Sequence, residues 1–152
     1  YPELGGGSLY DIGIYPMELL PYYADQKITQ MQFLKKDYST GVDDIVSLNL
    51  QLERCIANIQ CSFTTKMPED AYLYGSDGYI HIPKIHFGNR ARLYDLEDRL
   101  VEDFHEGLDN GFYYEVCEVI SCIEKGQTES SICPLNMTYD NAKLFDHVLR
   151  SR

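Results

Sequence analysis

The chain has 152 residues, of which 44% are hydrophobic and 24% are charged, a composition typical of one globular domain with a buried core. Its formal net charge is -11 at pH 7, which argues against nucleic acid or an anionic membrane as a partner, because both require basic surfaces. No run of apolar residues approaches the roughly 20 that a membrane-spanning helix needs.

The first predicted element is a helix that follows the glycine turn 5–7, with Ser8 as a suitable N-cap. Apolar residues at helical spacing predict one buried side, formed by Leu9, Ile12, Pro16, Leu19 and Leu20. Asp11 and Tyr15 lie four residues apart on another side, so that a carboxylate and a phenol can face the same volume. Pro16 is expected to break the helix and to leave the Ile12 carbonyl without a partner.

Asp11 and Tyr15 are the candidate catalytic pair, and structural explanations of both stay open. Asp11 can complement the helix dipole, and Tyr15 can be an amphipathic surface residue with a hydrated hydroxyl. The glycine turn follows no strand and does not fit GxGxxG, so a packing turn is favoured over a phosphate-binding loop.

Three strands with alternating polarity are predicted next, at 28–36, 44–53 and 55–64. The apolar positions of the second and third strands are Val46, Leu48, Leu50 and Leu52, then Cys55, Ala57, Ile59, Cys61 and Phe63. Helices are expected to cover this apolar face and to leave the other face open. The open face carries amides and hydroxyls, which are less costly to desolvate than charges, so a solvated sheet and an interface with a second copy both fit the pattern.

The second half of the chain is predicted to hold a hairpin at 71–83, short strands at 90–96 and 99–104, and helices at 112–125 and 139–149. The helix at 112–125 is expected to bury Val116, Val119, Ile120 and Ile123. His105 and Tyr113 flank the loop 104–111 and are candidates for substrate contacts, although loop packing explains both equally well. The fold class that follows is α+β, a single domain with a mainly antiparallel, open-faced sheet of about six to eight strands and helices packed on one face.

Five cysteines, an odd number, show neither CxxC spacing nor a histidine at the spacing of a zinc ligand. Buried free thiols in a reducing cytoplasm are therefore expected. His81 and His86 lack an evident third ligand, so no metal site is predicted.

Three segments together resemble the Gfo/Idh/MocA family of oxidoreductases, which includes glucose-fructose oxidoreductase, inositol dehydrogenase and dihydrodiol dehydrogenase. The segment 5–16 is similar to the family motif G-G-G-x-L-x-D-x-G-x-[His/Tyr], and Tyr15 matches its tyrosine-bearing branch. The segment 75–83 resembles the G-T-x-G-x-I-x-I-P hairpin, and the segment 123–130 resembles the late I-x-x-G-x-x-E-S motif. All three occur in the order of the family.

This resemblance implies the C-terminal domain of an oxidoreductase that uses NAD or NADP on a sugar, a polyol or a related alcohol or carbonyl. It implies that Asp11 and Tyr15 face the nicotinamide, that Tyr15 transfers the proton, and that Asp11 holds the substrate hydroxyl or tunes Tyr15. A phenol with a pKa near ~10 needs a nearby cation for this work, which in the family is a lysine of an E-K-P motif in the other domain. The present sequence contains no E-K-P.

The family also has an N-terminal Rossmann domain with a GxGxxG fingerprint, which this sequence lacks. The 152 residues are accordingly expected to be a fragment of a larger enzyme that by itself binds no cofactor and has no turnover. Family members commonly dimerise through the sheet, which favours a homodimer through the open face. The alternative is a non-catalytic module for ligand binding or assembly that retains the fold.

Overall fold

The computed structural model describes residues 4–86, 88–107 and 110–151, and within these it contains seven strands, three α-helices and a π-helical segment. The chain divides into two compact units, one formed by Tyr1–Met67 with Asn136–Arg152 and the other by Pro68–Leu135. All pairings are antiparallel, in one sheet of three strands and one of four. The predicted α+β class and strand number are confirmed, with the strands divided between two sheets.

The first sheet has the order β1-β2-β3, formed by β1 (Ile28–Asp37), β2 (Asp43–Leu52) and β3 (Ile56–Ser62). The central strand confirms the predicted alternation, since Val46, Leu48, Leu50 and Leu52 are only 0–2% exposed. On its polar face the Asn58 amide donates to Asn49 Oδ1 at 2.6 Å across the β2–β3 pair. At the ends of the third strand the prediction is wrong, because Cys55 and Phe63 lie outside β3 and are exposed.

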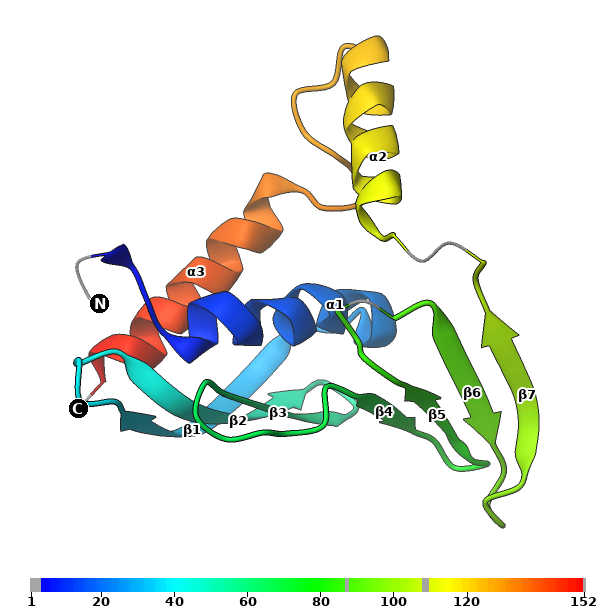
Figure 1. The fold of residues 1–152 in the computed structure, drawn as a ribbon, viewed down its shortest axis with the longest axis horizontal. Coiled ribbons are helices and arrows are strands. Elements are labelled where there is room, and N and C mark those ends of the chain that lie inside the picture. Colours follow the sequence, from blue (N-terminus) through cyan, green and yellow to red (C-terminus); the bar gives the residue numbers. More distant parts are fainter. Residues whose placement is uncertain (1–3, 87, 108–109, 152) are drawn as a thin grey trace. The chain divides into compact units, whose positions relative to one another are not determined.

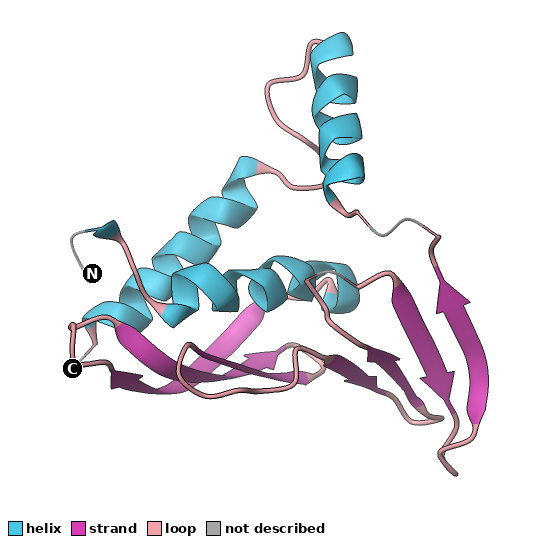
Figure 2. Ribbon diagram, viewed as in Figure 1, coloured by secondary structure: helices cyan, strands magenta, loops and turns pink. Residues whose placement is uncertain are grey.

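Helices cover the apolar face of this sheet, as predicted (Figure 1; Figure 2). The π-helical segment η2 (Leu9–Gly13) runs directly into α1 (Ile14–Ala24), and α3 (Leu135–Arg150) packs beside them. The core joins Leu9 and Met17 of the first two helices to Phe145 and Val148 of α3 and to the apolar side of β2. Burial of these side chains from both layers supplies the main stabilising free energy of the unit.

Pro16 does not break the first helix, contrary to the prediction. The helix changes from π to α at Ile14, so that Pro16 lies in the first turn of α1, where the missing N–H removes no helical hydrogen bond. The Ile12 carbonyl accepts from the Ile14 N–H instead of remaining without a partner. The helical backbone thus continues from η2 through Pro16 into α1.

The second sheet has the order β4-β5-β6-β7, formed by β4 (Ala71–Tyr74), β5 (Tyr79–Ile82), β6 (Arg90–Tyr94) and β7 (Leu100–His105). The predicted hairpin turn is confirmed by the Gly75 N–H, which donates to the Gly78 carbonyl at 2.9 Å. Gly78 has a φ of +149°, and a Cβ there would overlap the Tyr94 carbonyl. Glycine is required at this position because both the backbone angle and the space exclude a side chain.

Helix α2 (Phe112–Glu124) confirms the predicted element, but its predicted buried stripe is wrong. Val116, Val119, Ile120 and Ile123 are 50–71% exposed, and of the helix only Cys122 is buried. The helix packs against its own return loop, where the Cys122 thiol donates to the Glu129 carbonyl and the Ser130 hydroxyl donates to Glu118. Of the loop predicted before α2, Leu108 and Asp109 lie outside the described residues.

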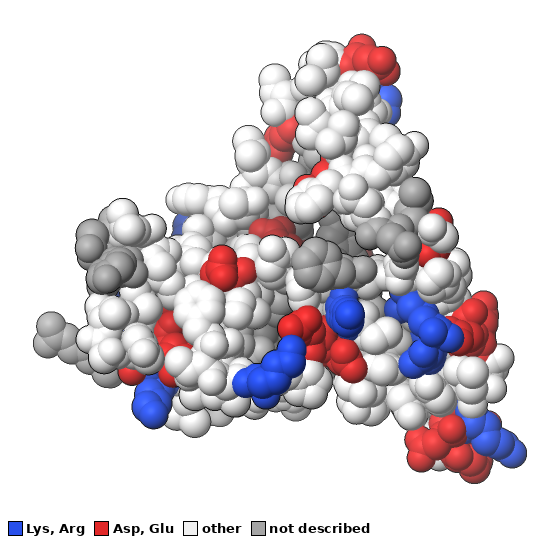
Figure 3. Space-filling view, in the orientation of Figure 1, with Lys and Arg blue, Asp and Glu red and all other residues white. Residues whose placement is uncertain are grey.

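All five cysteines are free thiols, as predicted, but only Cys61 and Cys122 are buried. Cys55, Cys117 and Cys133 are exposed, so the expectation of burial fails for three of the five. Acidic and basic side chains lie next to one another on the face in view (Figure 3). The ion pairs of the second unit include Arg99 with Asp95. In the described part of the chain, no helix has both the length and the hydropathy that crossing a bilayer requires.

Candidate functional site

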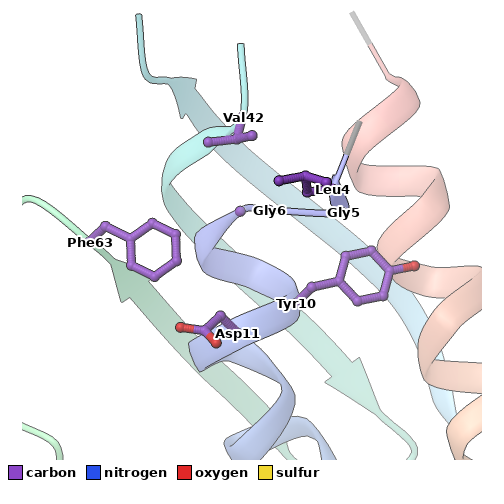
Figure 4. Close-up of a pocket in the computed structure, with 8 residues that line it drawn as sticks. Leu4, Gly5, Gly6, Tyr10, Asp11, Val42 and Phe63 are labelled. Carbon is purple, nitrogen blue, oxygen red and sulfur yellow. The ribbon is translucent and has the colours of Figure 1, made fainter. Parts of the chain in front are cut away.

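The glycine turn and η2 form one side of a pocket of about 560 Å³ (Figure 4). The residues that line it are Leu4, Gly5, Gly6, Gly7, Tyr10, Asp11, Val42 and Phe63. Val42 comes from the turn between β1 and β2, and Phe63 follows the end of β3. Among these lining residues Asp11 carries the only carboxylate, so the described lining combines apolar side chains and glycine backbone with one acidic group.

The buried carboxylate of Asp43 holds the wall of the pocket that carries Asp11. Asp43 is 3% exposed, and its Oδ2 accepts from the Ser8 hydroxyl at 2.9 Å and from the Leu9 N–H at 2.7 Å. Ser8 occupies the predicted N-cap position but makes no side-chain cap bond, because its hydroxyl donates to Asp43. A carboxylate from β2 therefore caps the first turn of η2, with charge-assisted bonds shielded from water.

The same carboxylate explains why the turn before η2 needs glycine. Gly7 has a φ of +148°, and a Cβ there would overlap the Asp43 carboxylate. At Gly13 a Cβ would lie 2.8 Å from Leu9 Cδ1 and 3.3 Å from Cys61 Sγ, so this glycine lets the helix approach β3 closely. Packing thus accounts for Gly7, Leu9 and Gly13 and leaves Asp11 as a polar group that projects away from the core.

Asp44, the next residue of β2, holds the opposite side of the pocket. Thr64 donates to its carboxylate twice, from its hydroxyl to Oδ2 at 2.7 Å and from its N–H to Oδ1 at 3.1 Å. The Phe63 N–H donates to the Asp44 backbone carbonyl at 3.2 Å. Two adjacent buried acids therefore fix two separate segments, one leading to Asp11 and the other to Phe63.

Tyr10 joins η2 to α3 on the side away from Phe63 (Figure 4). Its ring packs edge to face against the ring of Phe145, with the ring centroids 5.1 Å apart. Its hydroxyl donates a hydrogen bond to Asp146 Oδ1 at 3.4 Å. Burial, followed by the negative charge of Asp146, raises the pKa of Tyr10. Tyr10 therefore stays protonated and serves as a hydrogen-bond donor that anchors the helix.

The structure places the predicted pair Asp11 and Tyr15 on consecutive turns of one helix, with both side chains exposed. The Asp11 carboxylate lies on the side of η2 that faces Phe63 (Figure 4). Tyr15 is 47% exposed in α1 and is not among the described residues that line the pocket. Their joint action on a substrate stays a prediction.

His105 and Tyr113 belong to the second unit. His105 ends β7 opposite Arg90, and Tyr113 packs edge to face on Tyr114 in the first turn of α2. Both residues are exposed, and their role in substrate contact stays a prediction. Among the described residues, no group of three or more side chains could hold a metal ion. The Nε2 atom of His81 lies 2.8 Å from Asp70 Oδ2 as a hydrogen-bond partner.

Comparison with known proteins gives a family match over residues 1–81, to the GFO/IDH/MocA C-terminal domain. The trans-1,2-dihydrobenzene-1,2-diol dehydrogenase of Mus musculus is 31% identical over 137 residues, which cover 86% of this chain and 41% of that protein. The corresponding enzyme of Danio rerio is 32% identical over 137 residues, again covering 41% of its length. The chain thus spans less than half the length of these relatives.

Two solved structures share the fold at low sequence identity. The aldose-aldose oxidoreductase from Caulobacter crescentus, complexed with glycerol, has a TM-score of 0.79 at 19% identity and covers 96% of this chain and 45% of that one. A mutant of KijD10, a 3-ketoreductase from Actinomadura kijaniata, was solved in complex with TDP-benzene and NADP. It has a TM-score of 0.74 at 16% identity, over 94% of this chain and 46% of that one.

Proposed function

This chain belongs to the GFO/IDH/MocA family, since its residues 1–81 match the C-terminal domain of that family, and from that premise we propose that it is the substrate-binding and dimerisation part of an NAD(P)-dependent oxidoreductase. The proposed substrate is a sugar, a polyol or a related alcohol or carbonyl. Relatives that are dihydrodiol dehydrogenases support an alcohol as the reacting group. The dinucleotide-binding domain is proposed to belong to the same whole protein, since the chain corresponds to 41% of each of these relatives.

The observation that carries the proposal is the exposed carboxylate of Asp11 in the pocket. Packing explains Gly7, Leu9 and Gly13 of the same motif, whereas none of the contacts given for the described core involves the carboxylate at position 11. A carboxylate that is the only charged group among the described lining residues can accept a hydrogen bond from a substrate hydroxyl and so fix its orientation. Tyr15, four residues further along the helix, supplies a hydroxyl that can donate or accept a proton.

When bound, a nicotinamide cofactor would supply the hydride chemistry of the proposed reaction. Hydride transfer at an alcohol or carbonyl carbon changes the charge on its oxygen, and a proton must move to or from that oxygen. We assign this proton to the Tyr15 hydroxyl and the orientation of the substrate hydroxyl to Asp11. The pocket does not suit the negatively charged pyrophosphate of the nucleotide, because the charged side chain among its described lining residues is the acid Asp11.

The dimerisation role is proposed for the polar face of the sheet β1–β3. The neutral polar side chains that β2 and β3 present on this face include Ser47, Asn49, Gln51, Asn58 and Gln60. Amides and hydroxyls can exchange hydrogen bonds with a second copy at lower desolvation cost than charges. Light scattering on the purified chain tests this role, and a strict monomer at high protein concentration would contradict it.

The enzymatic proposal is tested on the full-length protein by the absorbance of NADH and NADPH. A panel of sugars, polyols and diols is offered with each oxidised cofactor, and the matching carbonyls with each reduced one. We expect a substrate-dependent change in absorbance that Asp11→Asn reduces. An absence of any such change over the whole panel would favour the alternative of a non-catalytic binding module.

A further inference from the structure

We infer that the tyrosines of the second sheet form a site of oxidative modification, where a one-electron oxidant joins Tyr79 to Tyr94 as dityrosine. The oxidant is a small radical, and the carbonate radical is taken as its representative. The new bond would link β5 covalently to β6. This inference is independent of the proposed function, because both tyrosines belong to the second unit and the described lining of the pocket belongs to the first.

The first argument is the arrangement of the rings on one face of the sheet. Tyr79 of β5 is paired directly with Tyr74 of β4 and with Tyr94 of β6, and directly paired side chains lie on the same face. The ring centroids of Tyr79 and Tyr94 lie 5.0 Å apart, with the ring planes only 16° apart. The centroid of Tyr74 lies farther from that of Tyr79, at 5.7 Å, and its ring is tilted by 42°. Of these two neighbours, Tyr94 is therefore the closer stacking partner.

The second argument is a proton acceptor beside one of the two rings. The Tyr79 hydroxyl donates a hydrogen bond to Asp98 Oδ1 at 3.1 Å. Desolvation, followed by this hydrogen bond, raises the pKa of Tyr79, so its phenol stays protonated at neutral pH. Oxidation of the phenol makes that proton strongly acidic, and the Asp98 carboxylate lies where it can receive the proton. Tyr79 can thus form the neutral tyrosyl radical with the help of a local base.

The third argument is that the two rings are accessible to a small oxidant and yet held in place. Tyr79 and Tyr94 are half-buried, on strands whose backbones are paired in register. Because neither backbone can move away, two radicals formed on these rings meet each other rather than a ring of another copy. Tyr74, at 78% exposed, is the ring that exposure alone would favour. Geometry and exposure therefore predict different products.

The cross-link requires one oxidation on each ring. Tyr79 and Tyr94 each lose one electron and the hydroxyl proton, and two carbonate radicals take up the electrons to become carbonate. The two tyrosyl radicals then form one C–C bond between ring carbons adjacent to the hydroxyls. Each of these carbons releases its hydrogen as a proton and each oxygen regains one, which restores both aromatic rings. The overall change is the loss of two hydrogen atoms, one from each ring.

The test exposes the full-length protein to photochemically generated carbonate radicals and maps the products by mass spectrometry after digestion with trypsin. Trypsin separates Tyr79, in the peptide 67–84, from Tyr94, the only tyrosine of the peptide 93–99. We expect these two peptides to be joined, with a mass two hydrogens below their sum. On a denaturing gel the oxidised chain should still migrate as a single copy.

Tyr79→Phe is expected to abolish the joined peptides. Asp98→Asn is expected to lower their yield about threefold or more, and asparagine tolerates the φ of +59° at this position. The matched control is Tyr74→Phe, which removes the more exposed hydroxyl from the same peptide and should leave the yield unchanged. Joined peptides that disappear in Tyr74→Phe, oxidation confined to the peptide 67–84, cross-links between two copies, or an equal yield in Asp98→Asn would each overturn the inference.

Discussion

Removal of the Asp43 carboxylate should make alanine tolerable at Gly7, and this coupling can be measured as a double-mutant cycle. Asp43→Ala leaves the Ser8 hydroxyl and the Leu9 N–H without their acceptor in a buried place. At about 1–3 kcal/mol for each unsatisfied group, the expected loss of unfolding free energy is about 2–6 kcal/mol. Gly7→Ala places a Cβ on the Asp43 carboxylate at a φ of +148° and is expected to be destabilising by itself.

In the double variant the overlap disappears, because the carboxylate that the new Cβ would meet is gone. Of the cost of Gly7→Ala, only the backbone strain at position 7 then remains. The unfolding free energy of the double variant should therefore be about 1–3 kcal/mol higher than the sum of the two single effects predicts. The assay is urea unfolding followed by far-ultraviolet circular dichroism, with m-values compared between variants. The m-values must agree, so that the differences report the native clash rather than a changed unfolded state.

Gly5 provides the matched control for this cycle. Its φ of +68° is also positive, but within the described part of the chain no atom beyond its two neighbouring residues lies within 4 Å of an added Cβ. Gly5→Ala should therefore combine additively with Asp43→Ala. Additive behaviour of Gly7→Ala with Asp43→Ala, within about 0.5 kcal/mol, would refute the account of the Asp43 contact.

Three further predictions concern stability. Phe145→Ala should cost about 3–5 kcal/mol of unfolding free energy, since the ring is fully buried, and a loss below about 1 kcal/mol in urea unfolding would contradict this packing. Gly78→Ala should lower the Tm and raise hydrogen exchange in β4 and β5, and unchanged exchange would speak against the close approach of Tyr94. The hydrogen bond from His81 lowers the pKa of Asp70, so its stabilising effect is present above the usual carboxyl pKa of about 4 and is lost as the pH falls through the lower folded value. Asp70→Asn should therefore show a shallower fall of Tm on acidification than the wild type, and identical slopes would exclude this contribution.

The sequence was sufficient to predict the first sheet because strand alternation leaves few choices. Four apolar residues at a period of two in β2 determine which face is buried, and a shift by one residue would expose them all. The same reasoning failed for α2, since a helical stripe shows that one face is apolar but does not show what covers it. Val116 and Ile123 therefore fitted the pattern and are nevertheless exposed.

The two acids that frame the pocket could not be found from the sequence. Ser8 and Asp43 are 35 residues apart, and helix capping rules consider the local hydroxyl before a carboxylate from another element. A partial signal was the pair Asp43-Asp44 immediately before the alternating run of β2, in a strand where charges are unfavourable. Phe63 was misplaced because the alternation was continued two residues beyond Ser62, where β3 ends.

The central claim is that Tyr15 transfers the proton during hydride transfer, and the most direct measurement is kcat of Tyr15→Phe in the full-length protein. The matched control is Tyr23→Phe, which removes a phenol hydroxyl elsewhere in α1. The account predicts a fall in kcat of about 100-fold or more for Tyr15→Phe, with the Kd for NAD(P) unchanged and Tyr23→Phe equal to the wild type. A Tyr15→Phe protein that turns over at the wild-type rate would contradict it.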